Sequence, residues 1–409
     1  MVLFIGMVRR GEFETLQRRG VPLGVLVDSN SKHRLADVSG FAHVSHFDFS
    51  RPLAELIAAV RAIHNQRGVA CLLNLMEFYV VETAAIAAAL GLAGISPASA
   101  QLCRDKCVMR QRFAERIGSD ASAHFEEVHS EAALLDAAAR FGYPVFLQPS
   151  NVAASMWATR NTSPSMLLAN YHTMLRDVPN YYAQLGKHGS QLSVVLAEYL
   201  NGANTSIDCI ADAAGQVHTT PVVDVLTGQD VGIDDYHHFA RILPSGLSAA
   251  AQTDLQRRAV AGVQALEMTH SAAHVEFIGT RLGEIAARPG GNRPRILELA
   301  YGMDELHAYN QVLCGRPPEL LREHARAAAI VTPFSRQAGS LRSIRHLERL
   351  VGLRSYLYHE VRAQPGHSVG LAKDGCRAPL YIELLADDAA SVRSDVDEIA
   401  SWTDLYEVE

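Results

Sequence analysis

The sequence predicts a protein of mixed α/β and α+β class that is divided into several domains. The chain has 409 residues, which is too long for a single hydrophobic core, so two or three domains are expected. Strand and helix patterns alternate over residues 1–100, as they do in a parallel sheet covered by helices. Residues 321–409 have a different character, because glycines separate short strand-like pieces there. This change indicates a small α+β unit at the C-terminal end.

The first unit, residues 1–100, is expected to be a Rossmann-like parallel α/β domain. Apolar runs predict its strands, and apolar residues at helical spacing predict the helices between them. The expected strands are 2–5, 23–27, 44–47 and 69–75, and the expected helices are 13–19, 53–62 and 80–90. Gly6 and Gly11 are spaced wrongly for the glycine fingerprint of dinucleotide-binding domains, so the unit is not expected to bind NAD.

Three further units are expected at residues 101–200, 201–320 and 321–409. A basic helix over 103–117 begins this part of the chain and ends at Gly118, a residue type that commonly follows the last helical turn. The other expected helices are 132–140, 249–266 and 319–328, and the other expected strands are 142–149, 193–200, 205–211, 217–225, 355–361 and 380–385. The stretch 170–190 is polar and aromatic, and no element is predicted there.

Composition and charge narrow the functional classes. The net charge is −7 at pH 7 and no run of lysine and arginine rises above the background, which argues against nucleic-acid binding. The six cysteines are scattered without a zinc-ligand set, so free thiols in a reducing compartment are expected. No stretch approaches about 18 uninterrupted apolar residues, and the N-terminus lacks a signal-peptide pattern. A cytoplasmic protein without a membrane span is therefore expected.

The stretch 274–291 has the pattern of a β-hairpin that gathers charged residues on one face. If its turn centres on Thr280, Glu276 lies directly opposite Glu284, and cross-strand partners point to the same face. Strand alternation adds Arg288 to that face. Two carboxylates and a guanidinium suit a divalent cation and a phosphate group, because Mg²⁺ binds oxygen ligands and arginine binds phosphate through a planar fork. The alternative is an ordinary edge hairpin with solvated charges.

Further motifs precede the hairpin in a characteristic order. They are Asp105-Lys106 at the start of a helix, Tyr143-Pro144 with Gln148-Pro149, Glu198-Tyr199-Leu200-Asn201-Gly202, and Pro244-Ser245-Gly246-Leu247-Ser248. Together with His274-Val275-Glu276 and the run from Glu284 to Gly291, they resemble the ATP-grasp superfamily. Within it, they are similar to the carboxylate–amine ligases, which include L-amino acid ligases. The resemblance implies a central ATP-grasp lid subdomain, a catalytic subdomain and a small C-terminal subdomain.

The resemblance also implies a reaction. ATP would phosphorylate a substrate carboxylate, and an amine would then attack the acylphosphate and release phosphate. Lys106 would contact the ATP phosphates, and Glu276 and Glu284 would hold one or two Mg²⁺ ions. Arg288 and Glu284 would carry the catalytic step, with Arg288 holding the transferred phosphoryl group. The alternative for Lys106 is a solvated lysine on a helix surface.

The nucleotide-binding residues follow from the same resemblance. The backbone of residues 198–200 would bind the adenine edge, and Asn204 would bind the ribose. Gln148 stands where the superfamily has a second phosphate-binding lysine, so one positive charge is missing there, although glutamine can still donate a hydrogen bond. Residues 187–189, Lys-His-Gly, are a candidate to restore the charge, and a plain surface position is the alternative.

Substrate residues are expected near the hairpin and before the long helix. The candidates are His237, His238, Gly290, Gly291, Asn292 and Arg293. For the two histidines the alternative is a polar loop without contact to a substrate. Glu77 and Glu82 are candidates to receive an amino group, and surface placement is the simpler expectation for both.

Three hypotheses of function are open on the sequence. The first is a ligase that joins a carboxylate, expected to belong to an amino acid, to an amine, with ATP and Mg²⁺ as cofactors. The second is a degenerate ATP-grasp protein that binds a ligand without turnover, because Gln148 and Ala286 replace expected ligands and the loop 150–156 has no glycine. The third is a ligase that tailors a siderophore or a peptide natural product. The expected partners are small molecules, and the superfamily also suggests a homodimer.

Overall fold

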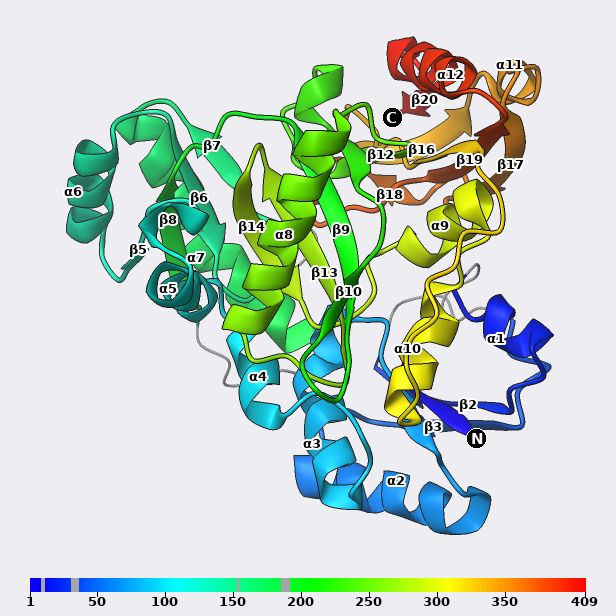
Figure 1. Cartoon of the computed structure of the whole chain (residues 1–409). Coiled ribbons are helices and arrows are strands. Elements are labelled where there is room, and N and C mark those ends of the chain that lie inside the picture. Colours follow the sequence, from blue (N-terminus) through cyan, green and yellow to red (C-terminus); the bar gives the residue numbers. More distant parts are fainter. Residues whose placement is uncertain (9–11, 31–36, 153–154, 185–191) are drawn as a thin grey trace.

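A computed structural model of the chain describes all residues except 9–11, 31–36, 153–154 and 185–191 (Figure 1). The N-terminal sheet is parallel, with strand order β3-β2-β1-β4. Its elements are β1 (Val2–Gly6), α1 (Glu14–Arg18), β2 (Leu23–Asp28), β3 (His43–Phe47), α2 (Leu53–Arg67), β4 (Cys71–Leu73), η1 (Glu77–Tyr79) and α3 (Val80–Leu90). The predicted alternation of strand and helix is confirmed, and α2 runs past its predicted end at residue 62.

A second sheet is antiparallel and has the strand order β5-β8-β6-β7. Its strands are β5 (Phe125–Val128), β6 (Val145–Pro149), β7 (Thr159–Asn161) and β8 (Val194–Glu198). The accompanying helices are α4 (Pro97–Leu102), α5 (Lys106–Arg116), η2 (Ser119–Ala121), α6 (Glu131–Phe141) and α7 (Pro164–Gln184). Helix α7 covers a stretch where no element was predicted. Its buried residues Leu167, Tyr171, Met174 and Val178 have helical spacing, but polar and aromatic neighbours obscure that pattern in the sequence.

The largest sheet contains nine strands and carries the hairpin at one edge. Its order is β14-β13-β9-β11-β12-β15-β19-β17, and β10 pairs with β9. Its strands are β9 (Asn204–Ala211), β10 (Val217–Thr219), β11 (Val223–Thr227), β12 (His238–Leu243), β13 (Ser271–Ile278), β14 (Arg281–Ala286), β15 (Ala327–Val331), β17 (Tyr356–Val361) and β19 (Leu380–Ala386). The helices of this region are η3 (Gln229–Val231), α8 (Ala249–Ala265), α9 (Arg293–Tyr301) and α10 (Glu305–Leu313). The expected units 201–320 and 321–409 both contribute strands to this sheet, and the boundary between them stays a prediction.

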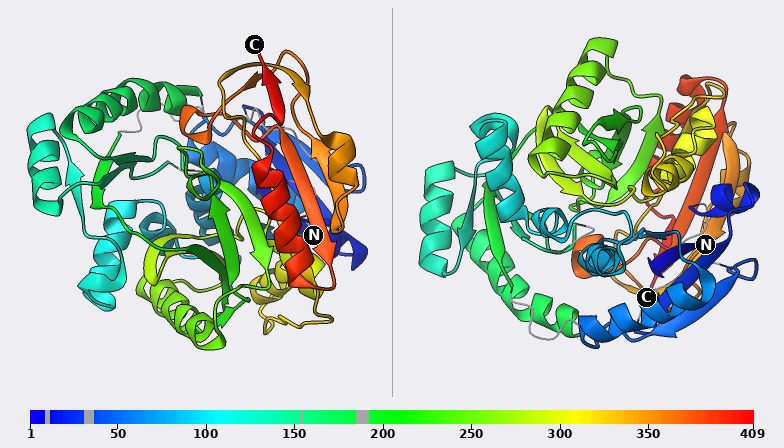
Figure 2. Two further views of the ribbon diagram at one scale, coloured as in Figure 1. Left: turned by 90° about the horizontal axis from the view of Figure 1, so that it is seen from above. Right: turned by 60° about the horizontal axis from the view of Figure 1, so that its bottom comes forward.

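The C-terminal segment adds a small sheet of order β18-β16-β20. Its elements are β16 (Gly339–Ile344), α11 (Leu347–Val351), β18 (Ser368–Val369), η4 (Ala372–Asp374), α12 (Ala389–Ser401) and β20 (Tyr406–Val408). The α+β character expected for this region is confirmed. Figure 2 shows the second sheet with α6 and α7 on the opposite side of the molecule from these C-terminal strands.

The helix expected over 319–328 is wrong. Residues 317–326 have no regular secondary structure, and Ala327 begins the buried strand β15. The alanines suggested a helix because alanine has the highest helix propensity. In the folded chain, β15 lies between β12 and β19, with α9 and α12 against it, and small side chains let helices approach a central strand. Tertiary packing therefore overrides local propensity here.

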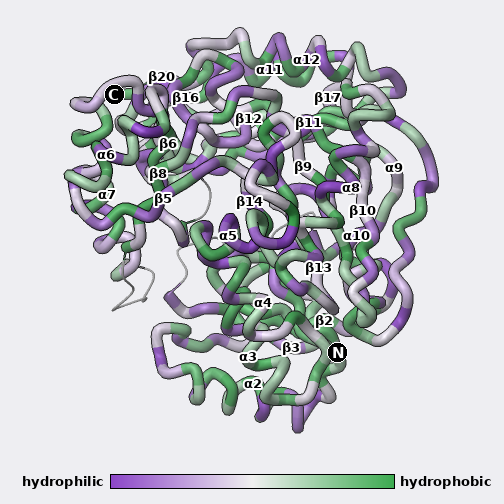
Figure 3. Tube along the Cα trace, turned by 60° about the vertical axis from the view of Figure 1, so that its left-hand side comes forward, coloured by the Kyte–Doolittle hydropathy of each residue, from purple (hydrophilic) through white to green (hydrophobic). Residues whose placement is uncertain are grey.

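The described helices include none that is long and apolar enough to cross a membrane. All six cysteines are free, as expected. Figure 3 shows the contrast between α3, which is largely hydrophobic, and α5, whose basic residues make it hydrophilic. Even so, Lys106 and Arg110 of α5 are buried. Charged side chains are rarely buried unless they are paired or bind a ligand, so α5 is a candidate part of a functional site.

Candidate functional site

The hairpin of β13 and β14 brings two carboxylates face to face. Its turn has two residues, because Ile278 pairs with Arg281. The register then shifts so that Glu276 pairs directly with Glu284, which leaves Gly283 as the extra residue of a β-bulge. Without the bulge, the two glutamates would be one residue out of register and would point to opposite faces. The predicted pairing is therefore confirmed, and the bulge is its cause.

The other face of the hairpin is held firmly by the core. Val275, Phe277 and Ile285 belong to the hydrophobic cluster that also contains residues of α5 and α8. A Cβ atom added to Gly262 of α8 would lie 2.7 Å from Cδ1 of Ile285, so glycine allows the helix to approach this closely. The two glutamates thus stand on a rigid support.

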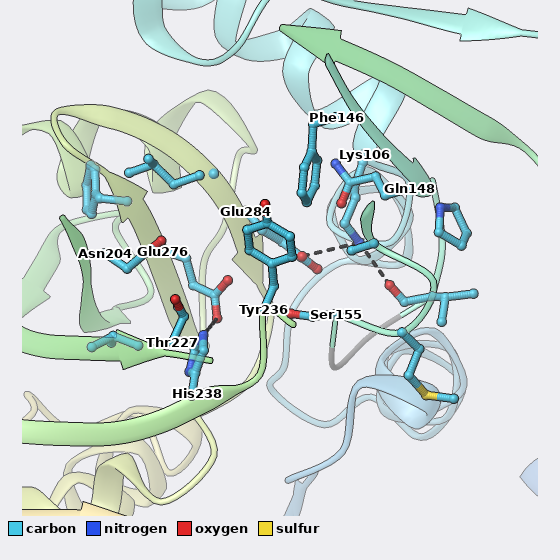
Figure 4. A pocket seen from close by; sticks show the side chains of 18 of the residues that line it. Lys106, Phe146, Gln148, Ser155, Asn204, Thr227, Tyr236, His238, Glu276 and Glu284 are labelled. Atoms are coloured by element: carbon cyan, nitrogen blue, oxygen red, sulfur yellow. Dashed lines mark hydrogen bonds and ion pairs between the residues drawn. The ribbon is translucent and has the colours of Figure 1, made fainter. Parts of the chain in front are cut away.

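Lys106 joins the hairpin to the segment that follows β6. The side chain of Asp105 caps α5 by accepting a hydrogen bond from the backbone N–H of Cys107 at 2.8 Å. Lys106, the first residue of the helix, donates from Nζ to the carbonyl of Val152 at 3.0 Å, and its Nζ lies 3.2 Å from Oε2 of Glu284 (Figure 4). Lys106 is only 6% exposed, so the alternative of a solvated lysine is wrong.

A cavity lies beside this contact and brings many of the predicted site residues together. The predicted residues that line it are Lys106, Gln148, Asn204, His238, Glu276 and Glu284 (Figure 4). Phe146 and Tyr236 add an aromatic wall, and their rings meet edge to face with centroids 5.0 Å apart. Such a cavity suits a ligand with a flat ring at one end and charged groups at the other.

A chain of polar side chains lies behind Glu276. His274 Nδ1 is 2.6 Å from Oδ1 of Asp208, and His274 Nε2 is 3.1 Å from Oε1 of Glu276. His238 Nε2 lies 3.6 Å from the same glutamate oxygen. These contacts fix the orientation of the Glu276 carboxylate, because both of its neighbours are themselves held by the sheet.

The polar side chains of Asp208, His274 and His238 also influence the charge of Glu276. Burial works against a charged His274, but the adjacent Asp208 carboxylate outweighs it and raises the pKa of His274. Burial also works against a charged Glu276, yet the hydrogen bond from His274 and the nearby His238 lower the pKa of Glu276. For His238, burial dominates and lowers its pKa well below the usual value. These shifts favour an ionised Glu276 and a neutral His238.

Arg288 reaches from the end of the hairpin to the N-terminal segment. Its Nε lies 3.0 Å from Oε2 of Glu77, and Arg104 donates to Oε1 of Glu77 at 2.8 Å. Glu77 is 3% exposed, so its expected surface placement is wrong. Burial raises the pKa of Glu77, but Arg104 and Arg288 outweigh it and lower the pKa. Arg288 is not among the described residues that line the cavity, and its contact with a phosphoryl group stays a prediction.

Gly290 is in contact with Asp208 and His274, two of the polar side chains next to Glu276. Its backbone N–H donates to Oδ2 of Asp208 at 2.6 Å. A Cβ atom at this position would lie 2.3 Å from Nδ1 of His274 and 2.4 Å from Cγ of Arg293, both of which are buried. The structure therefore explains this glycine by the packing of His274, a role that the sequence did not indicate.

The next three residues, 291–293, lie at the start of α9. Arg293 is 1% exposed, and its Nε donates to Oγ of Ser206 at 2.8 Å. Its Nη1 donates to the carbonyl of Gly291 at 3.3 Å, and Asn292 stands at the start of α9 with a positive φ of 62°. None of the stretch 290–293 is among the described residues that line the cavity, so the predicted substrate contacts stay predictions.

The two adjacent histidines are placed differently. His238 lines the cavity, whereas His237 is buried beside Asp235, with 3.1 Å between Nδ1 and Oδ1. The ring of His237 also packs against Phe334, with 4.1 Å between the ring centroids. The structure thus brings only His238 of this pair to the cavity, because successive residues at the start of a strand point to opposite sides.

Glu198 ends β8, and the loop that follows it contacts the hairpin turn. Oε1 of Glu198 accepts a hydrogen bond from the backbone N–H of His124 at 3.0 Å. A Cβ atom on Gly202 would lie 2.8 Å from the backbone nitrogen of Gly279, so the two loops touch there. The described residues that line the cavity include none from 198–200, and the adenine contact stays a prediction. The candidate cation at 187–189 lies outside the described residues.

Some cavity residues were missed by the sequence analysis. Arg110 lines the cavity one helical turn after Lys106, and their spacing of four residues on the predicted helix was a usable signal. Phe146 lies two residues before Gln148 on the same strand, so strand alternation could have placed both on one face. Tyr236 comes from a loop, and no local pattern indicates it.

The cavity residues fit a magnesium–nucleotide complex better than a metal ion alone. No three His, Cys, Asp or Glu side chains within the described residues lie close enough to hold a metal without other ligands. Glu276 and Glu284 nevertheless offer two carboxylates on one wall. Mg²⁺ in proteins is usually bound by one or two carboxylates together with phosphate oxygens and water.

No known protein-family profile matches the chain, and no curated protein sequence is significantly similar to it. Solved structures, in contrast, match it along its whole length and show that it has the ATP-grasp fold. The L-amino acid ligase of Bacillus licheniformis superposes with a TM-score of 0.80 at 17% identity, over 100% of this chain and 98% of the other. The fold expected from the motifs is thereby confirmed.

Two further solved structures share this fold and were determined with nucleotide. An N5-carboxyaminoimidazole synthetase from Staphylococcus aureus, complexed with ADP, gives a TM-score of 0.71 at 13% identity over 98% of both chains. The biotin carboxylase domain dimer of 2-oxoglutarate carboxylase from Hydrogenobacter thermophilus, in complex with MgADP, ADP and bicarbonate, gives 0.68 at 15% identity. It covers 100% of this chain and 90% of the other. At these identities the likeness establishes the shared fold alone.

Proposed function

We propose that the protein is an ATP-dependent ligase that joins a carboxylate to an amine. The observation that carries this proposal is the convergence of Lys106, Glu276 and Glu284 on one cavity of an ATP-grasp fold. Phosphoryl transfer is catalysed mainly by positioning and by neutralising phosphate charge. Two carboxylates for Mg²⁺ and a buried lysine for phosphate meet both needs.

Each side chain of the cavity has a role in this proposal. Glu276 and Glu284 would hold Mg²⁺, which when bound neutralises phosphate charge, and Lys106 would bind a phosphate oxygen. Phe146 and Tyr236 would bind the adenine ring by stacking and edge contacts. His238 lines the cavity as a neutral ring, so it would accept a hydrogen bond from the attacking amine.

The substrate carboxylate is proposed to belong to an amino acid. This choice is supported by the similarity of the whole chain to an L-amino acid ligase, with a TM-score of 0.80. The ligase would first form an acylphosphate and ADP, and the amine would then displace phosphate to give the amide. Arg288 and the stretch 290–293, which follow the hairpin in the sequence, would orient the substrate.

The proposal is tested by the release of ADP with pairs of amino acids in the presence of ATP and Mg²⁺. The wild type should release ADP only when a suitable carboxylate and amine are both supplied. At a Mg²⁺ concentration that just saturates the wild type, Glu284→Gln should lose most of this activity, whereas Glu348→Gln, which changes an exposed glutamate of α11, should keep it. Absence of amine-dependent ADP release from the wild type with every pair would refute the ligase.

A second candidate, a ligand-binding protein without turnover, is favoured by one observation. Gln148, a neutral residue, lines the cavity, and the buried Ala286 of β14 offers no metal ligand. Calorimetry with a nonhydrolysable ATP analogue and Mg²⁺ separates the candidates. Nucleotide binding without any ADP release would support the second candidate, whereas amine-dependent ADP release would exclude it.

We also propose a homodimer in solution. The support is the biotin carboxylase domain that shares the fold and was solved as a dimer. Light scattering coupled to size-exclusion chromatography measures the mass directly. A mass near that of one 44.5 kDa chain at micromolar concentration would contradict a stable dimer.

A further inference from the structure

Arg110 is a buried cation that lines the candidate cavity and is 6% exposed. Its Nε and Nη1 atoms are buried without a hydrogen-bond partner, and no carboxylate of the described residues lies within ion-pair distance. The contact that the structure shows is with the ring of Phe125, whose centroid lies 5.8 Å from Cζ of Arg110. A cation–π contact at this distance is weak compared with an ion pair.

The position of Arg110 relates it directly to Lys106. The two residues are four apart on α5, so they stand on the same face of the helix. Lys106 already has Glu284 as its carboxylate partner at 3.2 Å. Gln148 lines the same cavity and is neutral. Glu284 thus acts on Arg110 only from beyond contact distance, and the buried Nε and Nη1 donors of Arg110 have no hydrogen-bond partner.

Such an arrangement is unfavourable unless an anion completes it. Burying a charge without a partner is much less favourable than burying a charge that is paired and hydrogen-bonded. Burial accordingly lowers the pKa of Arg110, although Glu284 opposes this effect. Arginine nevertheless stays protonated, and its fork of donors matches the oxygen atoms of a phosphate group.

We propose that Arg110 binds phosphate oxygens of the nucleotide in this cavity, one helical turn from Lys106. This assignment rests on the proposed function, because both require a nucleoside polyphosphate in the cavity. It also gives the cavity a second phosphate-binding cation in addition to Lys106. A purely structural role, in which Arg110 only packs on Phe125, is the alternative that the experiment must separate.

Calorimetric binding of a nonhydrolysable ATP analogue with Mg²⁺ is the main measurement, and adenosine is the reference ligand. Arg110→Met should weaken binding of the ATP analogue about 10-fold to 100-fold, the usual effect of losing a hydrogen bond to a charged group. Binding of adenosine should stay unchanged, because adenosine carries no phosphate. A structural role would lower thermal stability without separating the two ligands.

The matched control is Arg112→Met on the same helix. Arg112 is about a third exposed and lies near Glu115 and Glu267, so its removal should leave both affinities unchanged. Adding Gln148→Lys to Arg110→Met should restore part of the lost affinity for the ATP analogue, because it returns a positive charge to the cavity. Equal affinity of the wild type and Arg110→Met for the ATP analogue would overturn the proposal.

The failures of the two proposals are distinguishable. If the wild type binds neither ligand, the proposed nucleotide site itself is wrong. If Arg110→Met does not fold, labelling of wild-type arginines with phenylglyoxal, read by mass spectrometry, decides the question. Arg110 should be protected by the ATP analogue and not by adenosine, and equal labelling with both ligands would overturn its assignment.

Discussion

Lys106 and Glu284 are in contact across the cavity wall, with 3.2 Å between Nζ and Oε2. The contact joins the first residue of α5 to the bulged strand β14, two elements that lie far apart in the sequence. Each group neutralises the other, and both line the cavity together with Glu276. A substitution of either residue should therefore change the affinity for nucleotide as well as the local charge balance.

Lys106→Met is expected to lower kcat/KM for ATP about 100-fold, since it removes a positioned donor that neutralises phosphate charge. Methionine keeps much of the length of the side chain, so packing changes little. Lys373→Met serves as the control, because Lys373 pairs with Asp234 and neither is among the described residues that line the cavity. Steady-state kinetics with varied ATP and saturating carboxylate and amine measure both variants. A Lys106→Met enzyme as active as the control would contradict this role.

Glu276→Gln and Glu284→Gln are each expected to raise the Mg²⁺ concentration that gives half-maximal activity, by about 10-fold or more. A neutral amide is a weaker ligand for a hard cation than a carboxylate. The exposed Glu348→Gln of α11 should titrate like the wild type. A magnesium titration at fixed ATP gives the values, and unchanged midpoints in both glutamate variants would remove these residues from the metal site.

Gly290→Ala is expected to lower the free energy of unfolding by about 1–3 kcal/mol, the usual effect of overpacking a buried site. The added methyl group would meet the ring of His274 at 2.3 Å and the side chain of Arg293 at 2.4 Å. At Gly246 the nearest atom lies 3.4 Å away on the side chain of Arg393, so Gly246→Ala is the control with the smaller effect. Urea denaturation of both variants checks this, and equal midpoints would disprove the packing argument.

His274→Gln is expected to destabilise the protein more at pH 6 than at pH 9. The pKa of His274 is raised in the folded state by Asp208, which means that the folded protein binds this proton more tightly than the unfolded chain. That stabilisation is complete below the unfolded pKa of about 6.5 and is lost as the pH rises through the folded pKa. Unfolding free energies measured across this range test it. A difference between wild type and variant that is independent of pH would count against the raised pKa.

The hairpin shows how far local patterns reach. The alternation of apolar and polar residues predicted both strands, and Glu276 and Glu284 were correctly placed opposite each other. The prediction assumed a turn centred on Thr280, whereas in the structure a two-residue turn and the bulge at Gly283 together produce this register. The helix predicted over 103–117 is confirmed as α5, and its end before Gly118 was predicted correctly, but it begins only at Lys106, after the N-cap Asp105.

Long-range contacts escaped prediction because they depend on packing. The segment 319–328 was expected to be helical, yet its alanines contribute to the central strand β15, where their small size matters more than their propensity. Glu77 was expected on the surface and is buried between Arg104 and Arg288. No local sequence pattern indicates that Arg104 and Arg288, from two different segments, both contact the carboxylate of Glu77.

The sequence by itself determined the alternating N-terminal domain, the charged hairpin and the order of motifs, because each is encoded in neighbouring residues by periodicity, caps and turns. Only the tertiary structure decided that Lys106 contacts Glu284, that His238 rather than His237 reaches the cavity, and that Arg110 is buried there with Nε and Nη1 lacking a hydrogen-bond partner. These facts depend on the burial of side chains by elements far away in the chain. Burial sets charge and reactivity, and it is a property of the whole fold.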